Sequence, residues 1–128
     1  MIGQLAMIAA GASLGAWLRW GLSHWLNPRI ADFPLGTLSA NLIGGYLVGI
    51  AVAFFSANTS LSPEWRLLAI TGFLGGLTTF STFSAEVVLL LQEDRWAMAF
   101  ILALVHLIGS LALTALGFAT YRAFASAA

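Results

Sequence analysis

The sequence predicts an all-α membrane protein, a single domain over residues 1–128 with four transmembrane helices. Of its 128 residues, 60% are hydrophobic and 8% are charged, whereas a soluble domain carries about 25% charged residues. Crossing a hydrocarbon core of about 30 Å takes about 20 helical residues, and four apolar runs reach that length. Tryptophans, whose amphipathic rings favour the membrane interface, fall near the proposed helix ends: Trp17, Trp20, Trp25, Trp65 and Trp96.

The four spans are expected at about residues 2–26, 35–55, 63–91 and 96–124. No basic residue precedes the apolar region of the first run, which continues to Arg19, so we interpret it as a retained helix rather than a signal peptide. The stretch 27–34, which contains Pro28 and Pro34, predicts a turn before the second span. Polar residues within 56–60 and 92–95 separate the later spans.

Small residues four positions apart occur on three of the predicted helices. This spacing lets two helix backbones approach closely, so it favours a compact bundle. The pairs are Gly11 with Gly15, Gly45 with Gly49, and Gly72 with Gly76.

Composition excludes several kinds of function. The sequence has no cysteine, which rules out disulfides, thiolate nucleophiles and cysteine-ligated metals. Two histidines, His24 and His106, are too few for a zinc triad. Five acidic residues balance five arginines, and there is no lysine, so no basic patch can neutralise the phosphates of a nucleic acid. We therefore expect neither nucleic-acid binding nor an enzyme.

The arginines do not define an orientation in the membrane. With four spans, Arg66 and Arg122 lie on the side of both termini, while Arg29 and Arg95, with Arg19 nearby, lie on the other side. Orientation is normally set by an excess of Lys and Arg on the cytoplasmic side. Without that excess the chain can insert both ways, and two copies can then pair as an antiparallel homodimer.

The third span contains a segment that is poor material for a continuous helix. Residues 72–84 combine paired glycines, β-branched threonines and a cluster of hydroxyl side chains. We predict a break near 75–79, whose freed carbonyls need a partner such as another chain, water or a cation. The alternative is a continuous helix in which the hydroxyls bond back to the preceding turn.

Polar side chains also recur within the second and fourth spans. Asn41 is either an interhelical hydrogen-bonding residue, worth about 1 kcal/mol, or a donor that faces an ion. His106, Ser110 and Thr114 follow one another at four-residue intervals, so they share one helical face over roughly 12 Å. Packing alone rarely requires three such groups in line, which makes this face a candidate pore lining.

Two charged residues are harder to assign from the sequence. Glu86 is the one acid well inside a predicted span, so it is either functional or close enough to the surface to be solvated. Arg19 either takes part in function or extends its long side chain to the interface. The candidate pathway otherwise offers neutral donors and phenylalanines. A cation path would show acidic rings or carbonyl cages, whereas hydrogen-bond donors and positive ring edges suit a small anion.

Three segments resemble the signature motifs of the Fluc (CrcB) fluoride channels, and the similarity covers nearly the whole chain. They are residues 11–20 (GASLGAWLRW), 36–44 (GTLSANLIG) and 75–84 (GGLTTFSTFS). The resemblance implies a dual-topology, antiparallel homodimer with two narrow pores in the bacterial inner membrane. Such a channel would export fluoride passively and so reduce its toxicity inside the cell.

By the same resemblance, the pore residues are Asn41, Phe80, Ser81, Thr82, Phe83, His106, Ser110 and Thr114. The ring edges of Phe80 and Phe83 would approach the anion. Histidine at position 106 departs from the hydroxyl expected there, and Glu86 matches an acid near the pore end whose role is unassigned. Backbone carbonyls of Gly75 and Thr78, contributed by both chains, would hold a structural sodium ion that is not transported.

Two other classes of membrane protein compete with a channel. A small four-helix multidrug exporter has this size and dual topology, but it requires an acid embedded in its first helix, where this chain has only Arg19 as a charge. A structural or assembly subunit would use the polar residues of the fourth span for packing. Measurements of flux distinguish the three classes. Fluoride flux without proton coupling would indicate a channel, proton-coupled drug movement an exporter, and no flux a structural subunit.

Overall fold

The computed structural model describes residues 1–30 and 33–127, and within them it is helical with no strand. Four helical spans are long and apolar enough to cross a membrane, so the prediction of a multi-pass membrane protein with four helices is confirmed. The first is α1 (Ile2–Leu26), continued by a short 3-10 turn, η1 (Asn27–Arg29). The second is α2 (Leu35–Ala57), and the fourth is α6 (Trp96–Ala127).

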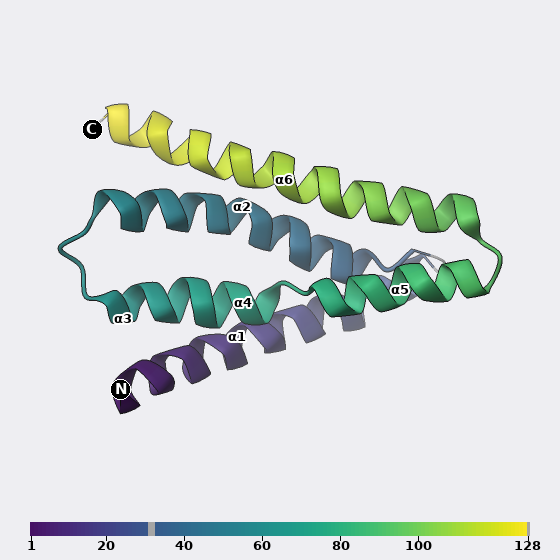
Figure 1. The fold of residues 1–128 in the computed structure, drawn as a ribbon, viewed down its shortest axis with the longest axis horizontal. Helices are drawn as coiled ribbons and strands as arrows, with labels where there is room; N and C mark the ends of the chain where they lie inside the picture. The colour runs from purple at the N-terminus through teal and green to yellow at the C-terminus, as the bar shows by residue number, and fades with distance from the viewer. Residues whose placement is uncertain (31–32, 128) are drawn as a thin grey trace.

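The third span is assembled from four consecutive pieces. It begins with α3 (Pro63–Arg66) and continues through η2 (Leu67–Leu74), which has the wider hydrogen-bonding pattern of a π-helix. A last short turn, α4 (Gly75–Leu77), precedes an extended segment, and α5 (Phe80–Gln92) completes the crossing. Figure 1 shows this interruption part-way along the span, between α4 and α5.

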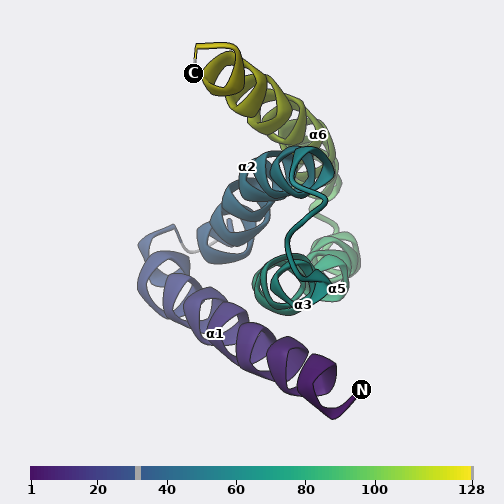
Figure 2. The ribbon, with the colours of Figure 1, turned by 90° about the vertical axis from the view of Figure 1, so that its left-hand side faces the viewer.

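The spans alternate in direction, so the two termini lie at the same end of the molecule (Figure 1). Seen from that end, α1 and α6 occupy opposite edges, and α2 lies between them beside the third span (Figure 2). At the far end, the Asn27 side-chain oxygen accepts a hydrogen bond from the Gly36 N–H at 2.7 Å, which ties the first connection to the start of α2. The predicted turn over 27–34 includes residues 31 and 32, which lie outside the described residues.

All three predicted small-residue pairs lie where helix backbones meet. A Cβ on Gly11 would lie 2.3 Å from the Leu68 carbonyl oxygen, and one on Gly76 would lie 2.4 Å from that of Ala12. On the other side of the bundle, a Cβ on Gly49 would lie 2.2 Å from the carbonyl oxygen of Thr114. Backbone atoms cannot rotate away as side chains can, so glycine is what permits α1 to pack on the third span and α2 on α6.

The break falls at the carboxyl end of the predicted range. Thr78 (φ −84°, ψ 153°) and Thr79 (φ −151°, ψ 124°) are extended, whereas Gly75 and Gly76 remain helical. The break therefore lies within the range predicted from the sequence, at the two threonines, while the paired glycines continue the helix. Gly76 is retained in the helix because it allows close contact with α1, while the β-branched threonines occupy the extended segment that suits them.

Candidate functional site

The extended segment of the third span is held by the side chain of Asn41 from α2. In an extended residue the backbone N–H and C=O point to the same side, as they do in a paired strand. The Thr79 N–H donates to Asn41 Oδ1 at 2.7 Å, and Asn41 Nδ2 donates to the Thr79 carbonyl at 2.9 Å. One amide side chain thus satisfies both polar groups of Thr79, as a residue of a neighbouring strand would.

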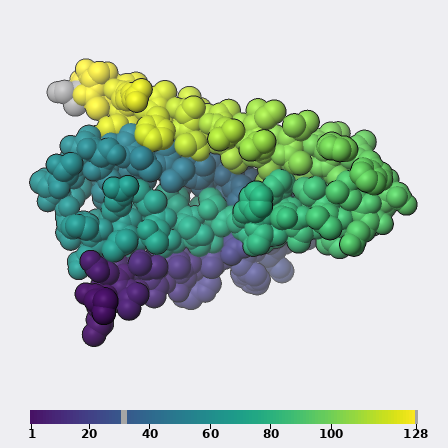
Figure 3. All heavy atoms as spheres, viewed as in Figure 1, coloured from purple at the N-terminus to yellow at the C-terminus, as the bar shows by residue number. Residues whose placement is uncertain are grey.

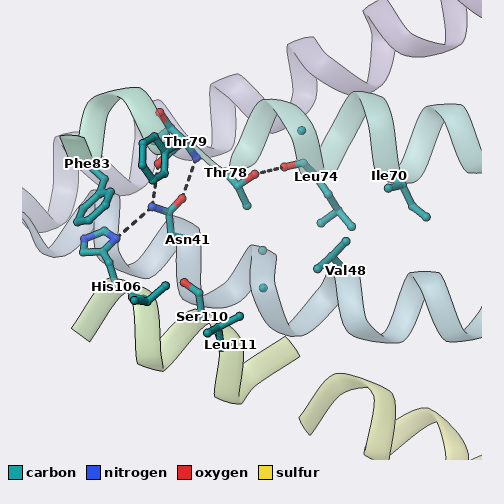
Figure 4. A pocket seen from close by; sticks show the side chains of 15 residues that line it. Asn41, Val48, Ile70, Leu74, Thr78, Thr79, Phe83, His106, Ser110 and Leu111 are labelled. Atoms are coloured by element: carbon teal, nitrogen blue, oxygen red, sulfur yellow. Dashed lines mark hydrogen bonds between the residues drawn. The ribbon is translucent and has the colours of Figure 1, made fainter. Parts of the chain in front are cut away.

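His106 of α6 completes this arrangement from the other side. Its Nδ1 lies 3.1 Å from Asn41 Nδ2, and its ring stacks on Phe83 with centroids 4.4 Å apart and 26° between the planes. Figure 4 shows the Asn41 amide between Thr79 and His106, with Phe83 beside the histidine ring. Three spans therefore meet at the break through one connected polar cluster, Thr79–Asn41–His106.

A groove of about 440 Å³ runs along this cluster, with walls from α2, the third span and α6. On the face seen in Figure 3 the surface is hollowed between α2 and the third span. At Gly44 the Thr78 side chain packs directly on the backbone of α2, because a Cβ on Gly44 would lie 2.2 Å from Thr78 Cγ2. Seven of the residues predicted for the pore or the sodium site line the groove: Asn41, Gly75, Thr78, Phe80, Phe83, His106 and Ser110.

The remaining three pore candidates take other positions. Thr114 donates its hydroxyl to the Gly45 carbonyl at 2.9 Å, which is the interhelical packing role. Ser81 and Thr82 are exposed on the first turn of α5. There the Thr79 hydroxyl donates to Thr82 Oγ1 at 3.1 Å and lies 3.4 Å from Ser81 Oγ. The face predicted for residues 106, 110 and 114 is therefore divided between groove lining and helix packing.

The break leaves carbonyl groups without their usual helical donors. In a continuous helix the Thr79 N–H would bond to the Gly75 carbonyl, but it bonds to Asn41 instead. The Thr82 N–H would likewise bond to the Thr78 carbonyl, but it donates to the Thr79 hydroxyl at 3.2 Å. The carbonyls of Gly75 and Thr78, the two predicted sodium ligands, are thus released from the helix, and both residues line the groove.

Arg19 contacts the third span beside the break. Its Nε donates to the Gly76 carbonyl at 3.1 Å, across the contact between α1 and the third span. The acceptor belongs to the last turn of α4, where the negative end of the helix favours a nearby cation. The guanidinium therefore stabilises a carbonyl that the break would otherwise expose at membrane depth.

Glu86 lies below the surface, hydrogen-bonded to α2. The Thr37 hydroxyl, which is 2% exposed, donates to Glu86 Oε1 at 2.6 Å. Glu86 Oε2 is buried and has no hydrogen-bond partner among the described residues. The carboxyl also borders a second cavity of about 290 Å³, whose wall includes Asn27, Glu93 and Arg95.

Comparison with known proteins identifies the group to which this sequence belongs. A family model described as "CrcB-like protein, Camphor Resistance (CrcB)" matches residues 6–118. The chain belongs to the CrcB family. A relative from Pseudomonas putida strain W619, named fluoride-specific ion channel FluC, is 62% identical over 123 residues, which cover 94% of this chain and 95% of the relative.

Two further relatives of this CrcB family member carry the same name. The protein from Pseudomonas syringae pv. maculicola is 58% identical over 124 residues, covering 95% of this chain and 96% of its own. The protein from Nitrosospira multiformis is 58% identical over 118 residues, covering 92% of each chain. These names describe ion channels rather than enzymes, in agreement with the sequence analysis.

The roles of two threonines in this CrcB family member were not predicted from the sequence: Thr37, which donates to Glu86, and Thr79, which pairs with Asn41. Thr37 was available from spacing, because it precedes Asn41 by four residues and so shares its helical face. Thr79 was included in the predicted break, but not as the backbone partner of Asn41. That contact joins two residues that are 38 positions apart in the sequence and lie on different spans. No local pattern signals that contact.

Proposed function

We propose that this protein is a fluoride-specific channel that lets fluoride leave the cell passively, driven by its electrochemical gradient, and so reduces fluoride toxicity. We place it in the inner membrane of a bacterium. The observation that carries the proposal is the groove at the broken third span, lined by Asn41, Phe80, Phe83, His106 and Ser110. It occurs in a chain 62% identical to a relative named as a fluoride-specific channel.

The chemistry of the groove suits a small anion. Its polar groups include amide and hydroxyl donors, and none of its lining residues is an acid. The rings of Phe80 and Phe83 lie 5.6 Å apart at 73°, an edge-to-face arrangement. The edge of an aromatic ring carries positive charge, so these rings can approach an anion without the water-binding strength of an ammonium group. Removing water from a small anion is costly, and short-range donors must replace it.

Efflux from liposomes tests this function directly. Purified protein is reconstituted in vesicles loaded with potassium fluoride, and valinomycin is added to carry the compensating charge. We expect rapid fluoride release without proton movement, and no release from vesicles loaded with potassium chloride. Proton-coupled transport of organic cations would instead indicate an exporter. A folded, reconstituted protein that moves neither would contradict the channel proposal.

We further propose that the working unit is an antiparallel homodimer with two pores. Phe80 on the wall of the groove is 78% exposed, so one chain does not enclose a pore around it. Lysines added to the amino terminus should fix one orientation and abolish fluoride flux, because the termini lie at one end of the molecule. Co-expression with a variant carrying lysines in the opposite loops should restore the flux. Undiminished flux from the singly biased protein would exclude the inverted dimer.

The sodium ion is proposed as a structural partner of that dimer. The residues fit such an ion, since the carbonyls of Gly75 and Thr78 have lost their helical donors and both residues line the same groove. Carbonyls of unwound helical segments are suitable ligands for sodium in membranes. One chain offers two oxygens, and an inverted copy would offer two more. Replacing sodium by N-methylglucamine should weaken dimer association, whereas an unchanged dimer would exclude this role.

A further inference from the structure

His106 lines the groove, but its place in the wall does not account for how its ring is hydrogen-bonded. His106 is 3% exposed, and its Nε2 is buried without a hydrogen-bond partner among the described residues. Its other ring nitrogen, Nδ1, contacts Asn41 Nδ2 at 3.1 Å. The ring thus makes one hydrogen bond, and that bond is directed to the residue that holds the helix break.

The direction of this hydrogen bond follows from the backbone. A peptide N–H can only donate and a peptide C=O can only accept, and Asn41 is paired with both groups of Thr79. The oxygen of the Asn41 amide must therefore face the Thr79 N–H, and its nitrogen must face the Thr79 carbonyl. The second hydrogen of that nitrogen is directed to His106. Consequently Nδ1 of His106 is the acceptor, and the neutral ring carries its proton on Nε2.

We propose that His106 is a positioning residue that acts through Asn41. Its hydrogen bond to the Asn41 amide holds that amide in the orientation that pairs with the extended segment of the third span. This inference rests on the proposed channel function. By accepting from Asn41, the Nδ1 atom occupies the one amide hydrogen that Thr79 leaves free. The amide then has all its donors paired and a single favoured orientation.

Stacking makes the imidazole a firm anchor for this bond. The ring lies against Phe83 at a centroid distance of 4.4 Å, and Phe83 itself borders the groove (Figure 4). His106 therefore connects the two features on which conduction is proposed to depend, the break and the phenylalanine pair. A side chain at 106 that packs but cannot accept would leave a partly buried Asn41 N–H unpaired, and the amide could rotate away from Thr79.

Two substitutions separate positioning from direct contact with the ion. His106→Asn keeps an acceptor two bonds from Cβ, at the place of Nδ1, and removes the group at the place of Nε2. His106→Gln does the reverse, because its longer side chain carries the amide out to the place of Nε2. His106→Leu removes both, and His24→Asn, at the exposed histidine stacked on Trp20, is the matched control.

We expect His106→Leu and His106→Gln to lower fluoride efflux by about tenfold or more, while His106→Asn rescues most of the loss. Rescue by glutamine but not asparagine would overturn the proposal, since it would make Nε2 the working group. Full flux in all three variants would overturn it as well. Loss in both amide variants would mean that the ring itself is required and would also overturn it.

The tautomer provides a readout that depends on neither flux nor the folding of variants. In wild-type protein labelled with ¹⁵N-histidine, we expect His106 Nδ1 to resonate as a non-protonated imidazole nitrogen and Nε2 as a protonated one. The exposed His24 serves as the internal reference. A proton on His106 Nδ1 would overturn the proposal. If the wild-type protein moved no fluoride but showed the expected tautomer, the channel function would be excluded, while the positioning of Asn41 by His106 would still be supported.

Discussion

Adding one methyl group at Gly15 should separate the first helix from the broken span. A Cβ there would lie 2.0 Å from the Phe73 carbonyl oxygen and 2.7 Å from the Leu77 nitrogen. Both are backbone atoms, so Gly15→Ala requires a movement of whole helices. Overpacking of this kind costs about 3 kcal/mol at the upper end of its usual range. Alanine recovers about 1 kcal/mol through its higher helix propensity.

The net loss for Gly15→Ala is therefore about 2 kcal/mol, roughly a thirtyfold change in the folded-to-unfolded ratio. Gly21→Ala is the matched control, because a Cβ at that position on the same helix would meet no described residue within 4 Å beyond the backbone of its own helix. Titration of micelle-solubilised protein with SDS, followed by circular dichroism, measures both variants. The reasoning is refuted if Gly15→Ala is as stable as Gly21→Ala, because the two helices would then not be in backbone contact.

Three further substitutions test the polar and aromatic groups of the site. Asn41→Asp keeps an acceptor for the Thr79 N–H but loses both donated bonds, so fluoride efflux should fall by at least about tenfold while the protein still purifies normally. Unchanged efflux would remove Asn41 from the pathway. Phe80→Ile should abolish efflux but leave the free energy of unfolding within about 0.5 kcal/mol of the wild-type value, because the ring is 78% exposed. Normal efflux from this variant would contradict the place of Phe80 in the pore. Thr37→Val removes the donor to Glu86 and should lower the free energy of unfolding by about 1–3 kcal/mol, as measured by SDS titration, and an unchanged value would show that the carboxyl finds another partner.

The fold was predictable because bilayer thickness and helix geometry leave few solutions for this sequence. Four apolar runs of sufficient length determine four crossings, and pairs such as Gly11 with Gly15 indicate where backbones meet. The break was predictable in kind, since β-branched residues and hydroxyls weaken a helix. Its approximate position was also predictable, but the exact residues that unwind were not, because Gly76 lowers helix propensity yet stays helical where it packs against Ala12 of α1.

The sequence indicated several of the residues that line the groove but not the contacts that they make. Helical spacing placed His106 and Ser110 on one face, and both line the groove. Spacing could not show that Thr114 would instead donate to the Gly45 carbonyl. Nor could it show that Arg19 would reach Gly76, since that contact depends on how closely two helices approach. Partners remote in sequence are fixed by packing, which periodicity does not describe.

The pairing of Asn41 also constrains how an anion can use the same amide. Both of its N–H groups are engaged, one with the Thr79 carbonyl and one with His106. A fluoride ion at this position must therefore compete with a neutral acceptor. Hydrogen bonds to a charged acceptor are about twice as strong as those between neutral groups, so a partly dehydrated anion can displace one of these partners. The bond to His106 can be replaced while the paired bonds to Thr79 keep the break in place. Exchange at a single hydrogen bond would let the residue that stabilises the broken helix also contact the ion, without unfolding the segment it holds.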